Sequence, residues 1–365
     1  MIKAAIVGCG KIADDHAWAI SLIPDAKIVG VCDIEELMAR QLSERFKIER
    51  YFRDIHDMLQ ATRPDVVHIT TPPQSHFEIG KICLNAGCHA YIEKPFTVNG
   101  DEADQLVRLA EQKKLKLTVG TDEQYTNVAI RMRKFINDGF LGAPLVHMEV
   151  HYCYDLGDER YARSFLANKT HWVRRLPGKL MHNVISHGIA KIAEYLPGDN
   201  IKVIAYGYTS NFLRNLGEDD LIDELRVILN GDNKTTAYFT FSTQMRPLLR
   251  EFRIFGPKNG LIINQEHHSI IKVPGKNYIS YLNKFIPLNY CSKQYRKNMV
   301  ANARLFLKRD FHMKSGLKRL IELFYRSISD NSPLPISYKE ILLTTKIMDS
   351  IFSQIYRNNN LDQRQ

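Results

Sequence analysis

Two glycines near the N-terminus stand where a nucleotide cofactor could be held. A short apolar run leads directly into the sequence Gly8-Cys9-Gly10-Lys11-Ile12-Ala13, and a stretch of helical period follows it. This is the context that a GxGxxA dinucleotide-binding loop requires: the first glycine permits a tight turn, and the second lets the backbone approach a diphosphate. The N–H groups and dipole of the helix N-terminus would favour that negative charge. The loop therefore predicts cofactor binding by residues 8–12.

An acidic residue follows at the spacing that such a loop leads us to expect. Asp33 lies 23 residues after Gly10, at the end of the second apolar run. A carboxylate at this place can bind both hydroxyls of an adenosine ribose and repels a 2′-phosphate, so NAD is favoured over NADP. The alternative is that Asp33 only caps the following helix. The loop, strand, helix and acid in register favour cofactor binding.

The elements that must position these residues are visible in the first 120 residues. Short apolar runs alternate there with stretches of helical period, the runs being residues 3–8, 27–33, 65–70, 88–92 and 115–120. This alternation predicts parallel strands with right-handed crossovers, and hence a doubly wound Rossmann sheet of the α/β class. We therefore predict an NAD-binding Rossmann domain at residues 1–121.

Beyond Gly120 the pattern changes. Long alternating segments between residues 202 and 273 are separated by turn signals, which indicates a large, open, mostly antiparallel sheet in an α+β domain. Helices are predicted at residues 127–137, 183–196 and 337–357, the last one opened by a capping box. We assign residues 122–365 to this substrate and oligomerisation domain.

Two further segments follow predicted parallel strands, at the sheet edge where open α/β sheets bind ligands. The first is Thr71-Pro72-Pro73 with Ser75-His76, and the second is Glu93-Lys94-Pro95. Together with the glycine loop and the two-domain outline, these segments resemble the Gfo/Idh/MocA family of glucose–fructose oxidoreductase-like dehydrogenases. The resemblance covers essentially the whole chain except parts of residues 276–326.

The resemblance implies roles for these segments. Lys94 would touch both nicotinamide and substrate as a proton-handling catalytic residue, and Thr71, Pro72, His76 and Glu93 would lie on the cofactor side. The chemistry fits independently, because hydride transfer from a carbinol carbon requires loss of the hydroxyl proton, which an amine can accept near neutrality when burial or a neighbouring cation lowers its pKa. The alternative is a pair of ordinary loop charges before a proline turn.

The family's second-domain motif is altered in this chain. Family members commonly carry an Asp-x-Gly-x-His pattern; the nearest alignment here places Asn183 at the aspartate and His187 at the histidine. On a helix, Asn183, His187 and Lys191 would share one face. Asn183 can orient a substrate hydroxyl but cannot carry a proton away. His187 with Lys94 is then the predicted acid–base pair, with His182 as an alternative to His187.

Two other segments take roles from the resemblance. Residues 171–175 resemble the family's Trp-x-Arg segment near the nicotinamide, so Trp172 is a predicted cofactor contact and Arg174 a predicted substrate contact. Residues 123–125 occupy the family's crossover between domains, so Gln124 is placed on the cofactor and Tyr125 on the substrate. The remaining histidines lack the Cys or acidic partners that a metal site needs, and no metal is predicted.

The net charge of +10 is confined to one segment. Residues 276–326 carry twelve Lys or Arg and two Asp or Glu, so the rest of the chain holds 38 of each sign. The segment also contains nine aromatic residues. A core-packed helix with a solvated basic face would explain part of it, because Leu317, Leu320 and Phe324 fall on one helical stripe. The alternatives are attraction to an anionic membrane surface and attraction to a diphosphate-bearing sugar. Nucleic-acid binding is disfavoured because the segment has no recognised nucleic-acid-reading motif.

These observations predict an NAD-dependent oxidoreductase acting on a secondary alcohol or ketone carbon of a sugar, with a nucleotide-linked sugar favoured by the basic segment. One alternative is an enzyme that uses tightly held NAD to oxidise a sugar transiently while a glycosidic bond breaks. The other is a non-catalytic NAD-binding regulator, which the loss of the aspartate at Asn183 leaves open. Six scattered cysteines and the lack of a signal-peptide pattern predict a cytoplasmic protein. The resemblance implies a homo-oligomer, dimer or tetramer.

Overall fold

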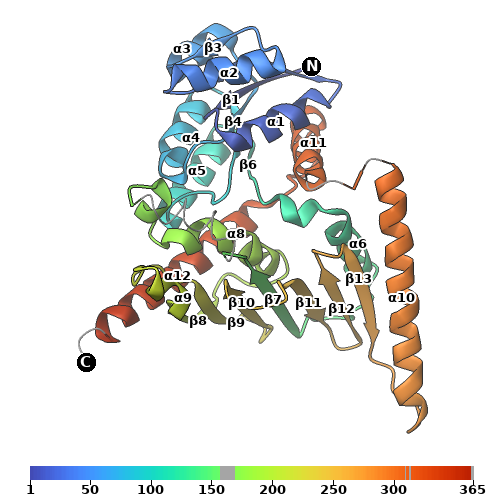
Figure 1. Cartoon of the computed structure of the whole chain (residues 1–365). Helices are drawn as coiled ribbons and strands as arrows, with labels where there is room; N and C mark the ends of the chain where they lie inside the picture. The colour runs from blue at the N-terminus through green and yellow to red at the C-terminus, as the bar shows by residue number, and fades with distance from the viewer. Residues whose placement is uncertain (157–168, 309, 312–313, 363–365) are drawn as a thin grey trace. The chain divides into compact units, whose positions relative to one another are not determined.

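The computed structural model describes residues 1–156, 169–308, 310–311 and 314–362. The chain divides into two compact units. The first contains Met1–Glu123 and Gly316–Lys346, and the second contains Gln124–Ser315 and Ile347–Gln365. Each unit has its own sheet (Figure 1).

The first unit is built on a six-stranded parallel sheet with the order β3-β2-β1-β4-β5-β6. Its strands are β1 (Ile2–Val7), β2 (Ala26–Cys32), β3 (Tyr51–Phe52), β4 (Val66–Ile69), β5 (His89–Ile92) and β6 (Leu117–Val119). The central strands are almost wholly buried, which is why they are continuous apolar runs in the sequence. This sheet confirms the Rossmann prediction.

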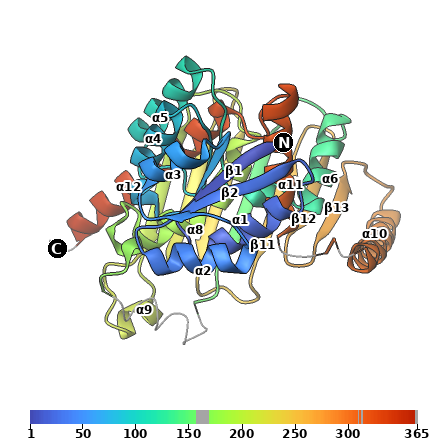
Figure 2. The same ribbon diagram turned by 90° about the horizontal axis from the view of Figure 1, so that it is seen from above.

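Helices cover both faces of this sheet. On one face lie α1 (Lys11–Ser21) and α2 (Glu36–Phe46); on the other lie α3 (Ile55–Thr62), α4 (His76–Asn85) and α5 (Gly100–Gln112) (Figure 2). Local sequence sets their ends: the Asn99 side chain accepts a hydrogen bond from the Glu102 N–H at 2.9 Å and so caps α5. The carboxyl ends of the parallel strands therefore meet at one edge, as the sequence predicted.

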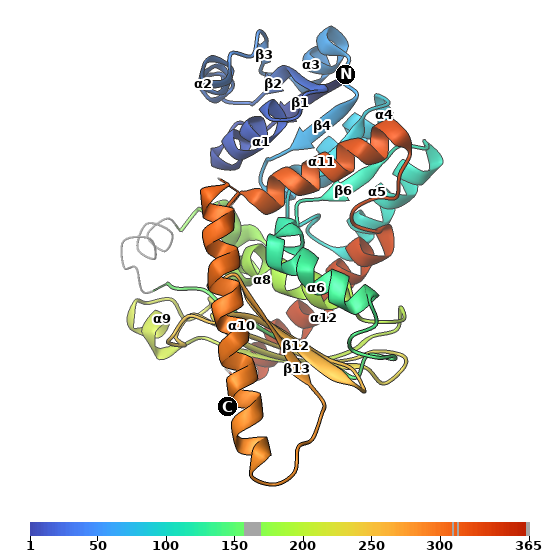
Figure 3. The same ribbon diagram turned by 90° about the vertical axis from the view of Figure 1, so that its right-hand side faces the viewer.

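A late segment returns to this first unit, which differs from the division into residues 1–121 and 122–365. Helix α11 (Ser315–Asp330) buries Leu317, Leu320 and Phe324, and Figure 3 shows it running beside the parallel sheet. The Phe324 ring packs edge-on against Tyr91 of β5 at 6.0 Å between centroids. The apolar stripe of α11 needs a partner to exclude water, and the Rossmann sheet provides it.

The second unit contains a seven-stranded sheet with the order β13-β12-β11-β7-β10-β9-β8. Its strands are β7 (His147–Cys153), β8 (Lys202–Tyr208), β9 (Glu224–Asn230), β10 (Thr236–Ser242), β11 (Arg250–Phe255), β12 (Asn259–Asn264) and β13 (Ser269–Pro274). β7 and β10 pair in parallel, and the other five pairs are antiparallel. The prediction of a mostly antiparallel sheet is confirmed.

Helices pack on one face of that sheet. They include α8 (Lys179–Ala193), which begins four residues before the helix predicted at 183–196, and the end of α12 (Tyr338–Asp362). Gly188 of α8 approaches β10 so closely that a Cβ there would lie 2.4 Å from the Phe239 ring. Gln354 of α12 hydrogen-bonds the backbone N–H of Ala205 and the carbonyl of Val203 on β8.

The other α-helices in the described part of the second unit are α6 (Asn127–Asn137), the short α9 (Asn211–Asn215) and α10 (Leu282–Leu307). α6 has the bounds that the sequence predicted. α10 runs along edge strand β13 (Figure 3), where its two buried residues are the polar Gln294 and Asn298. Among the described residues, no helix is long and apolar enough to cross a membrane.

Candidate active site

The glycine loop has the geometry that a dinucleotide diphosphate requires. Gly8 has φ +93°, and a Cβ there would lie 2.7 Å from the backbone nitrogen of Thr71, so only glycine fits. Gly10 is the N-cap of α1, and a Cβ added to it would meet nothing within 4 Å. As a glycine, this N-cap has no side chain to bond the first N–H groups of α1, so the helix N-terminus and the space at Gly10 suit an anion. The loop therefore fits the diphosphate of NAD.

Asp33 is tied to this loop. Its Oδ2 accepts a hydrogen bond from the Cys9 N–H at 2.6 Å, and its Oδ1 accepts one from the Glu35 N–H at 2.9 Å. Glu35, not Asp33, is the N-cap of α2, so helix capping does not account for the acid. A carboxylate oxygen accepts more than one hydrogen bond, and Asp33 can still receive ribose hydroxyls in this orientation.

The Thr-Pro-Pro segment is joined to the Glu-Lys-Pro segment by a buried histidine. His76 places Nε2 2.8 Å from the Thr71 carbonyl and Nδ1 3.0 Å from the Pro95 carbonyl. The ring is fully buried, and burial lowers the pKa of His76 although these carbonyls oppose the shift. A direct cofactor contact would require the ring to leave both partners. His76 therefore packs between the two loops, with one N–H to donate to a carbonyl, whereas Thr71 is half-buried and Pro72 is exposed at the sheet edge.

Glu93 and Lys94 follow β5 at that same edge. Glu93 is buried, and its Oε2 accepts a hydrogen bond from the Lys94 N–H at 3.1 Å. Burial alone would raise the pKa of Glu93, but the hydrogen bond from His16 and the charge of Lys94 outweigh it, so the pKa lies below its usual value. The Lys94 side chain is half-buried. A half-buried amine beside an ionised carboxylate can take up and release a proton at the sheet edge.

A second carboxyl group, which the sequence motifs did not predict, belongs to Asp122 and lies beside this pair. Asp122 follows β6, the neighbour of β5. Burial and the charges of Glu123 and Glu93 raise the pKa of Asp122 to about 7, against the opposing charge of Lys94. An acid three residues after the last parallel strand was a signal that could have found it, because every such strand end meets the same edge.

Two of the predicted site residues of the second unit, Asn183 and His187, lie on α8. Asn183, His187 and Lys191 are one helical turn apart, as expected, and the His187 ring stacks on Tyr152 of β7 at 6.4 Å. Lys191 is buried; its Nζ lies over the same Tyr152 ring and donates to Gln265 Oε1 at 2.5 Å. Asn183 and His187 remain partly exposed on this face.

His182, the alternative to His187, has a different environment. It is buried and stacks on the Phe352 ring of α12 at 4.9 Å between centroids. Five residues along a helix turn the side chain through about 140°, so His182 and His187 point to different sides of α8. The geometry favours His187 over His182 for contact with a ligand.

The predicted substrate contact Arg174 is engaged inside the second unit. Its guanidinium forms a bidentate pair with Glu218, at 3.0 Å and 2.9 Å. Burial alone would raise the pKa of Glu218, but the hydrogen bonds from Arg174 and Lys169 lower it. Glu218 already balances the Arg174 charge, so the pair orders this segment. Trp172 packs beside it against an apolar cluster formed by Leu156, Val173, Leu180, Leu213 and Leu221.

Gln124 and Tyr125 are also held inside the second unit. Both side chains are buried, and the Gln124 amide donates to Glu194 at 2.9 Å. Arg133 bonds the same carboxylate at 2.7 Å and lies over the Tyr125 ring. Contact of either residue with cofactor or substrate stays a prediction, since this cluster gives both a structural role.

The two units therefore differ in what they bring together. In the first unit, the glycine loop, Asp33, Thr71, Glu93 and Lys94 follow β1, β2, β4 and β5 at one sheet edge. In the second, Asn183 and His187 share one face of α8, whereas Arg174, Gln124 and Tyr125 are engaged in clusters of their own. The first unit alone can hold the dinucleotide and place an amine beside it.

Comparisons with known proteins agree with this geometry. Inositol 2-dehydrogenase of Salmonella typhimurium is 30% identical over 155 residues, which are 41% of this chain and 46% of the relative. UDP-N-acetylglucosamine 3-dehydrogenase of Acidithiobacillus ferrooxidans is 30% identical over 119 residues, 33% of this chain and 36% of that one. The matched segment thus spans less than half the length of these curated relatives.

A solved structure resembles the chain over almost its whole length. The WlbA dehydrogenase of Bordetella pertussis, crystallised with NADH and UDP-GlcNAcA, matches with a TM-score of 0.77 at 17% identity, covering 98% of this chain and 96% of that one. At this identity the match establishes the fold of both units. The sequence profile described as oxidoreductase family, NAD-binding Rossmann fold, matches residues 2–121. Residues 2–121 of this chain therefore match the NAD-binding Rossmann domain of the Gfo/Idh/MocA oxidoreductases.

Proposed function

We propose that this protein is an NAD-dependent oxidoreductase that transfers a hydride between nicotinamide and a secondary alcohol or ketone carbon of a sugar. The observation that carries the proposal is Lys94, half-buried at the carboxyl end of β5 beside ionised Glu93. The bound cofactor supplies the hydride acceptor or donor. Lys94 takes the proton of the substrate hydroxyl during oxidation and returns it during reduction. Asp33 and the loop at Gly8 and Gly10 hold the dinucleotide.

The proposed substrate class rests on the exposed face of α8 and on the substrates of the relatives. Asn183 and His187, partly exposed on α8, are proposed to orient the sugar hydroxyls, with His187 assisting proton transfer. We favour a nucleotide-linked sugar because a curated relative acts on UDP-N-acetylglucosamine and a whole-chain structural match holds UDP-GlcNAcA. Inositol 2-dehydrogenase among the relatives makes cyclitols the second class to test.

The proposal is tested on freshly purified protein by native mass spectrometry and by absorbance near ~340 nm, where NADH absorbs. Nucleotide sugars, free sugars and inositols are added singly with NAD. Binding of NAD followed by a rise in absorbance with one compound supports the dehydrogenase. Turnover of a glycoside with cofactor retained and no net NADH would indicate the transient-oxidation alternative. Failure to bind NAD or NADP would refute the assignment of the glycine loop.

Lys94→Met separates catalysis from binding. The variant should bind NADH with unchanged affinity and lose about 10²–10⁴-fold in kcat, because the proton acceptor is gone. Lys113→Met, at the exposed end of α5, is the matched control and should keep full activity. Full biological effect in Lys94→Met, with NAD affinity intact, would instead support a regulator.

We further propose a homo-oligomer that forms through the open face of the seven-stranded sheet. Side chains alternate along β8, β9 and β10, and the face away from α8 exposes Ile204 at 65%, Tyr206 at 61%, Ile228 at 48% and Tyr238 at 49%. These uncharged aromatic and aliphatic side chains line one contiguous surface. Large exposed apolar patches of this kind are typical of protein interfaces. A second copy presenting the same face would bury it by two-fold symmetry.

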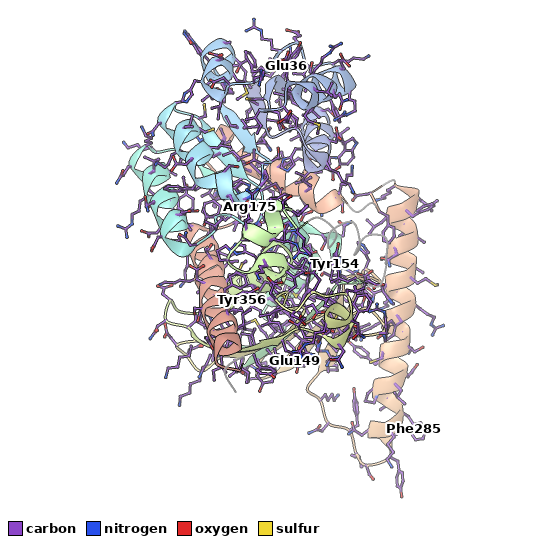
Figure 4. All side chains as sticks on the ribbon, turned by 60° about the vertical axis from the view of Figure 1, so that its left-hand side comes forward. Glu36, Glu149, Tyr154, Arg175, Phe285 and Tyr356 are labelled. Carbon is purple, nitrogen blue, oxygen red and sulfur yellow. The ribbon has the colours of Figure 1, made fainter. Side chains whose placement is uncertain are left out.

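We also propose that α10 contacts an anionic membrane surface. The helix carries five Lys or Arg and no Asp or Glu. Phe285, Leu288, Met299 and Phe306 are 65–70% exposed and fall on one stripe at intervals of three, eleven and seven residues. Figure 4 shows Phe285 where α10 extends past the strands of the sheet. Basic charge beside exposed apolar side chains is typical of helices that lie in a lipid headgroup region, and it would repel a second copy of α10.

One pair of variants tests both surfaces. Phe285→Ser with Leu288→Ser should reduce co-sedimentation with phosphatidylglycerol vesicles and leave the mass from light scattering unchanged. Ile204→Ser with Tyr238→Ser should lower that mass and leave vesicle binding unchanged. If the α10 variant instead lowers the mass, α10 is an interface between copies; if vesicles of phosphatidylglycerol never bind, the membrane proposal is wrong. A cytoplasmic location is proposed as well, supported by six cysteines that are all free thiols.

A further inference from the structure

A chain of four buried polar side chains leads from α11 to the Glu-Lys-Pro segment. Tyr325 Oη of α11 lies 2.8 Å from Nε2 of His68 on β4. His68 Nδ1 lies 2.8 Å from Nδ1 of His16 on α1, and His16 Nε2 lies 2.9 Å from Oε1 of Glu93. Both histidines are 0% exposed, Tyr325 is 3% exposed and Glu93 is 7% exposed. Three separate elements, α11, β4 and α1, thus supply the side chains of a hydrogen-bonded chain that ends at the Glu93 carboxylate.

The protons of this chain have a preferred direction. Ionised Glu93 only accepts, so His16 Nε2 must donate to it. A neutral His16 then accepts at Nδ1, so His68 donates from Nδ1 and accepts at Nε2 from the Tyr325 hydroxyl. In the reverse direction, with His16 positively charged, His68 would donate to Tyr325, and the buried hydroxyl proton would need another acceptor. Among the described residues, His68 is the one hydrogen-bond partner of the Tyr325 hydroxyl, so the reverse direction would leave the hydroxyl proton without an acceptor.

The surroundings hold the two imidazole rings in place and favour uncharged His68 and Tyr325. The Tyr91 ring stacks on His68 at 4.8 Å and meets His16 edge-on at 5.1 Å. Burial lowers the pKa of His68 well below its usual range and raises the pKa of Tyr325 well above its own. A proton passed from Tyr325 toward Glu93 would leave a buried tyrosinate, so the chain cannot serve as a proton supply.

The far end of Glu93 is fixed too. Its second oxygen accepts the Lys94 N–H, and a Cβ at Gly120 would lie only 2.4 Å from Oε1. The carboxylate therefore sits between His16, the backbone of Lys94 and the backbone of Gly120. Loss of the His16 hydrogen bond would free a carboxylate that lies between the ends of β5 and β6.

We propose that Tyr325, His68 and His16 are positioning residues that keep Glu93 ionised and aimed at the backbone of Lys94. The inference rests on the proposed role of Lys94 in proton transfer. It assigns a part in the site to α11, which lies outside residues 2–121 that match the family profile. The return of residues 316–346 to the first unit then has a functional reason as well as a packing one.

The tautomers give a test that needs no substrate. Long-range ¹H–¹⁵N spectra of the full chain with NADH should show neutral His16 protonated on Nε2 and neutral His68 protonated on Nδ1 at pH 7. Tyr325→Phe should shift the His68 Nε2 resonance toward that of a nitrogen without a hydrogen bond. Tyr338→Phe is the matched control, because its hydroxyl also donates to the Rossmann unit, to the Leu115 carbonyl at 3.3 Å. A charged His16, or His68 protonated on Nε2, would overturn the proposal.

The effect on Lys94 is measured by labelling. At pH 7, the rate of Lys94 acetylation by acetic anhydride, relative to Lys113, should rise about threefold or more in His16→Ala, because Glu93 loses the hydrogen bond that holds it against the Lys94 backbone and the half-buried amine becomes more accessible. His16→Gln, whose amide can donate as Nε2 does, should restore the slow rate. NADH affinity should stay unchanged in all three proteins.

These readouts separate the two proposals. If no sugar is turned over but the tautomers and labelling rates come out as expected, the proposed function fails and the positioning chain stands. If His16→Ala and His16→Gln label alike, or both match the unmodified chain, the chain is only part of the core and the inference is wrong. Comparable far-ultraviolet circular dichroism of the variants excludes loss of fold as the cause.

Discussion

Helices α10 and α11 come from one basic, aromatic stretch of sequence and are held in opposite ways. α11 buries Leu320 and Phe324 completely, while α10 leaves Phe285 and Phe306 at 68% and 70% exposure. The apolar residues of α11 recur at intervals of three, four and seven on one face, and the sheet of the first unit covers that face. The two helices have similar compositions. The spacing of the apolar side chains and the presence of a sheet facing them therefore decide which helix joins a core.

What fixes α10 is polar. β13 is an edge strand, whose outward backbone groups would otherwise lack partners. Gln294 bonds both the N–H and the carbonyl of Lys272, at 2.8 and 3.0 Å, and Asn298 bonds both groups of Ile270, at 3.2 and 2.9 Å. Two amides one helical turn apart thus take the place of another strand. The apolar side chains of α10 are left for contacts outside the unit.

The largest expected difference between the helices is in stability. Phe324→Ala should lower the free energy of unfolding of the first unit by about 3–5 kcal/mol, because it opens a cavity beside Tyr91. Phe306→Ala on α10 should change it by less than about 0.5 kcal/mol. Trp18 and Trp172 lie in different units, so urea unfolding followed by fluorescence in a Trp172→Phe background reports on the first unit alone. Equal losses from the two variants would contradict this contrast.

The next effect concerns the amides that hold α10. Asn298→Ala leaves the Ile270 N–H and carbonyl without their partner, which costs about 1–3 kcal/mol. Hydrogen exchange of the α10 amides, followed by mass spectrometry, should become about tenfold faster or more, since about 1.4 kcal/mol is a factor of ten. α11 should exchange at an unchanged rate.

Asn302→Ala is the control for that experiment. Its amide donates one exposed hydrogen bond to the His267 carbonyl at 2.9 Å, so its loss should alter exchange in α10 only slightly. If Asn302→Ala and Asn298→Ala speed exchange equally, the amide pairing with β13 is not what fixes the helix.

Local patterns account for much of the fold and for the cofactor half of the site. The Rossmann strands, the loop at Gly8 and Gly10, and Asp33 could be read from the sequence because each depends on neighbours within about 30 residues. The stripe on α11 was readable for the same reason. The sequence did not predict which sheet covers this stripe, because an apolar stripe shows only that a helix packs against a partner.

The remaining parts of the site depend on partners distant in sequence. Arg174 has the right type and place for a substrate contact, but Glu218, 44 residues later, binds its guanidinium in a fork. The hydrogen bond from Tyr325 to His68 spans 257 residues. No periodicity or motif encodes such pairs, because they arise only when two elements pack. Asp122 is the exception, since its position after β6 was visible in the chain.

The smallest expected effect is a pH dependence confined to the unit that α11 completes. Burial lowers the pKa of His68, so the unfolded chain binds a proton near pH 6.5 that the folded chain does not. Stability of the first unit should therefore be complete above that pH and fall as the pH drops below it, by at most about 1.4 kcal/mol per pH unit for this one proton. Urea unfolding of the Trp172→Phe protein at pH 7.0 and 5.5 measures the slope.

His68→Asn identifies the group responsible. The substitution destabilises the unit at both pH values, but the difference between pH 7.0 and 5.5 should shrink by the contribution of one proton. The buried His76 and the partly buried His89, whose pKa values burial also lowers, stay in both proteins and cancel from the comparison. The amides that hold α10 do not titrate, so its exchange should keep the same protection over this range once the intrinsic rate is corrected for pH. If the free energy of unfolding changes with pH as much in His68→Asn as in the parent protein, His68 is already charged in the folded state. The pH dependence would then not distinguish α11 from α10.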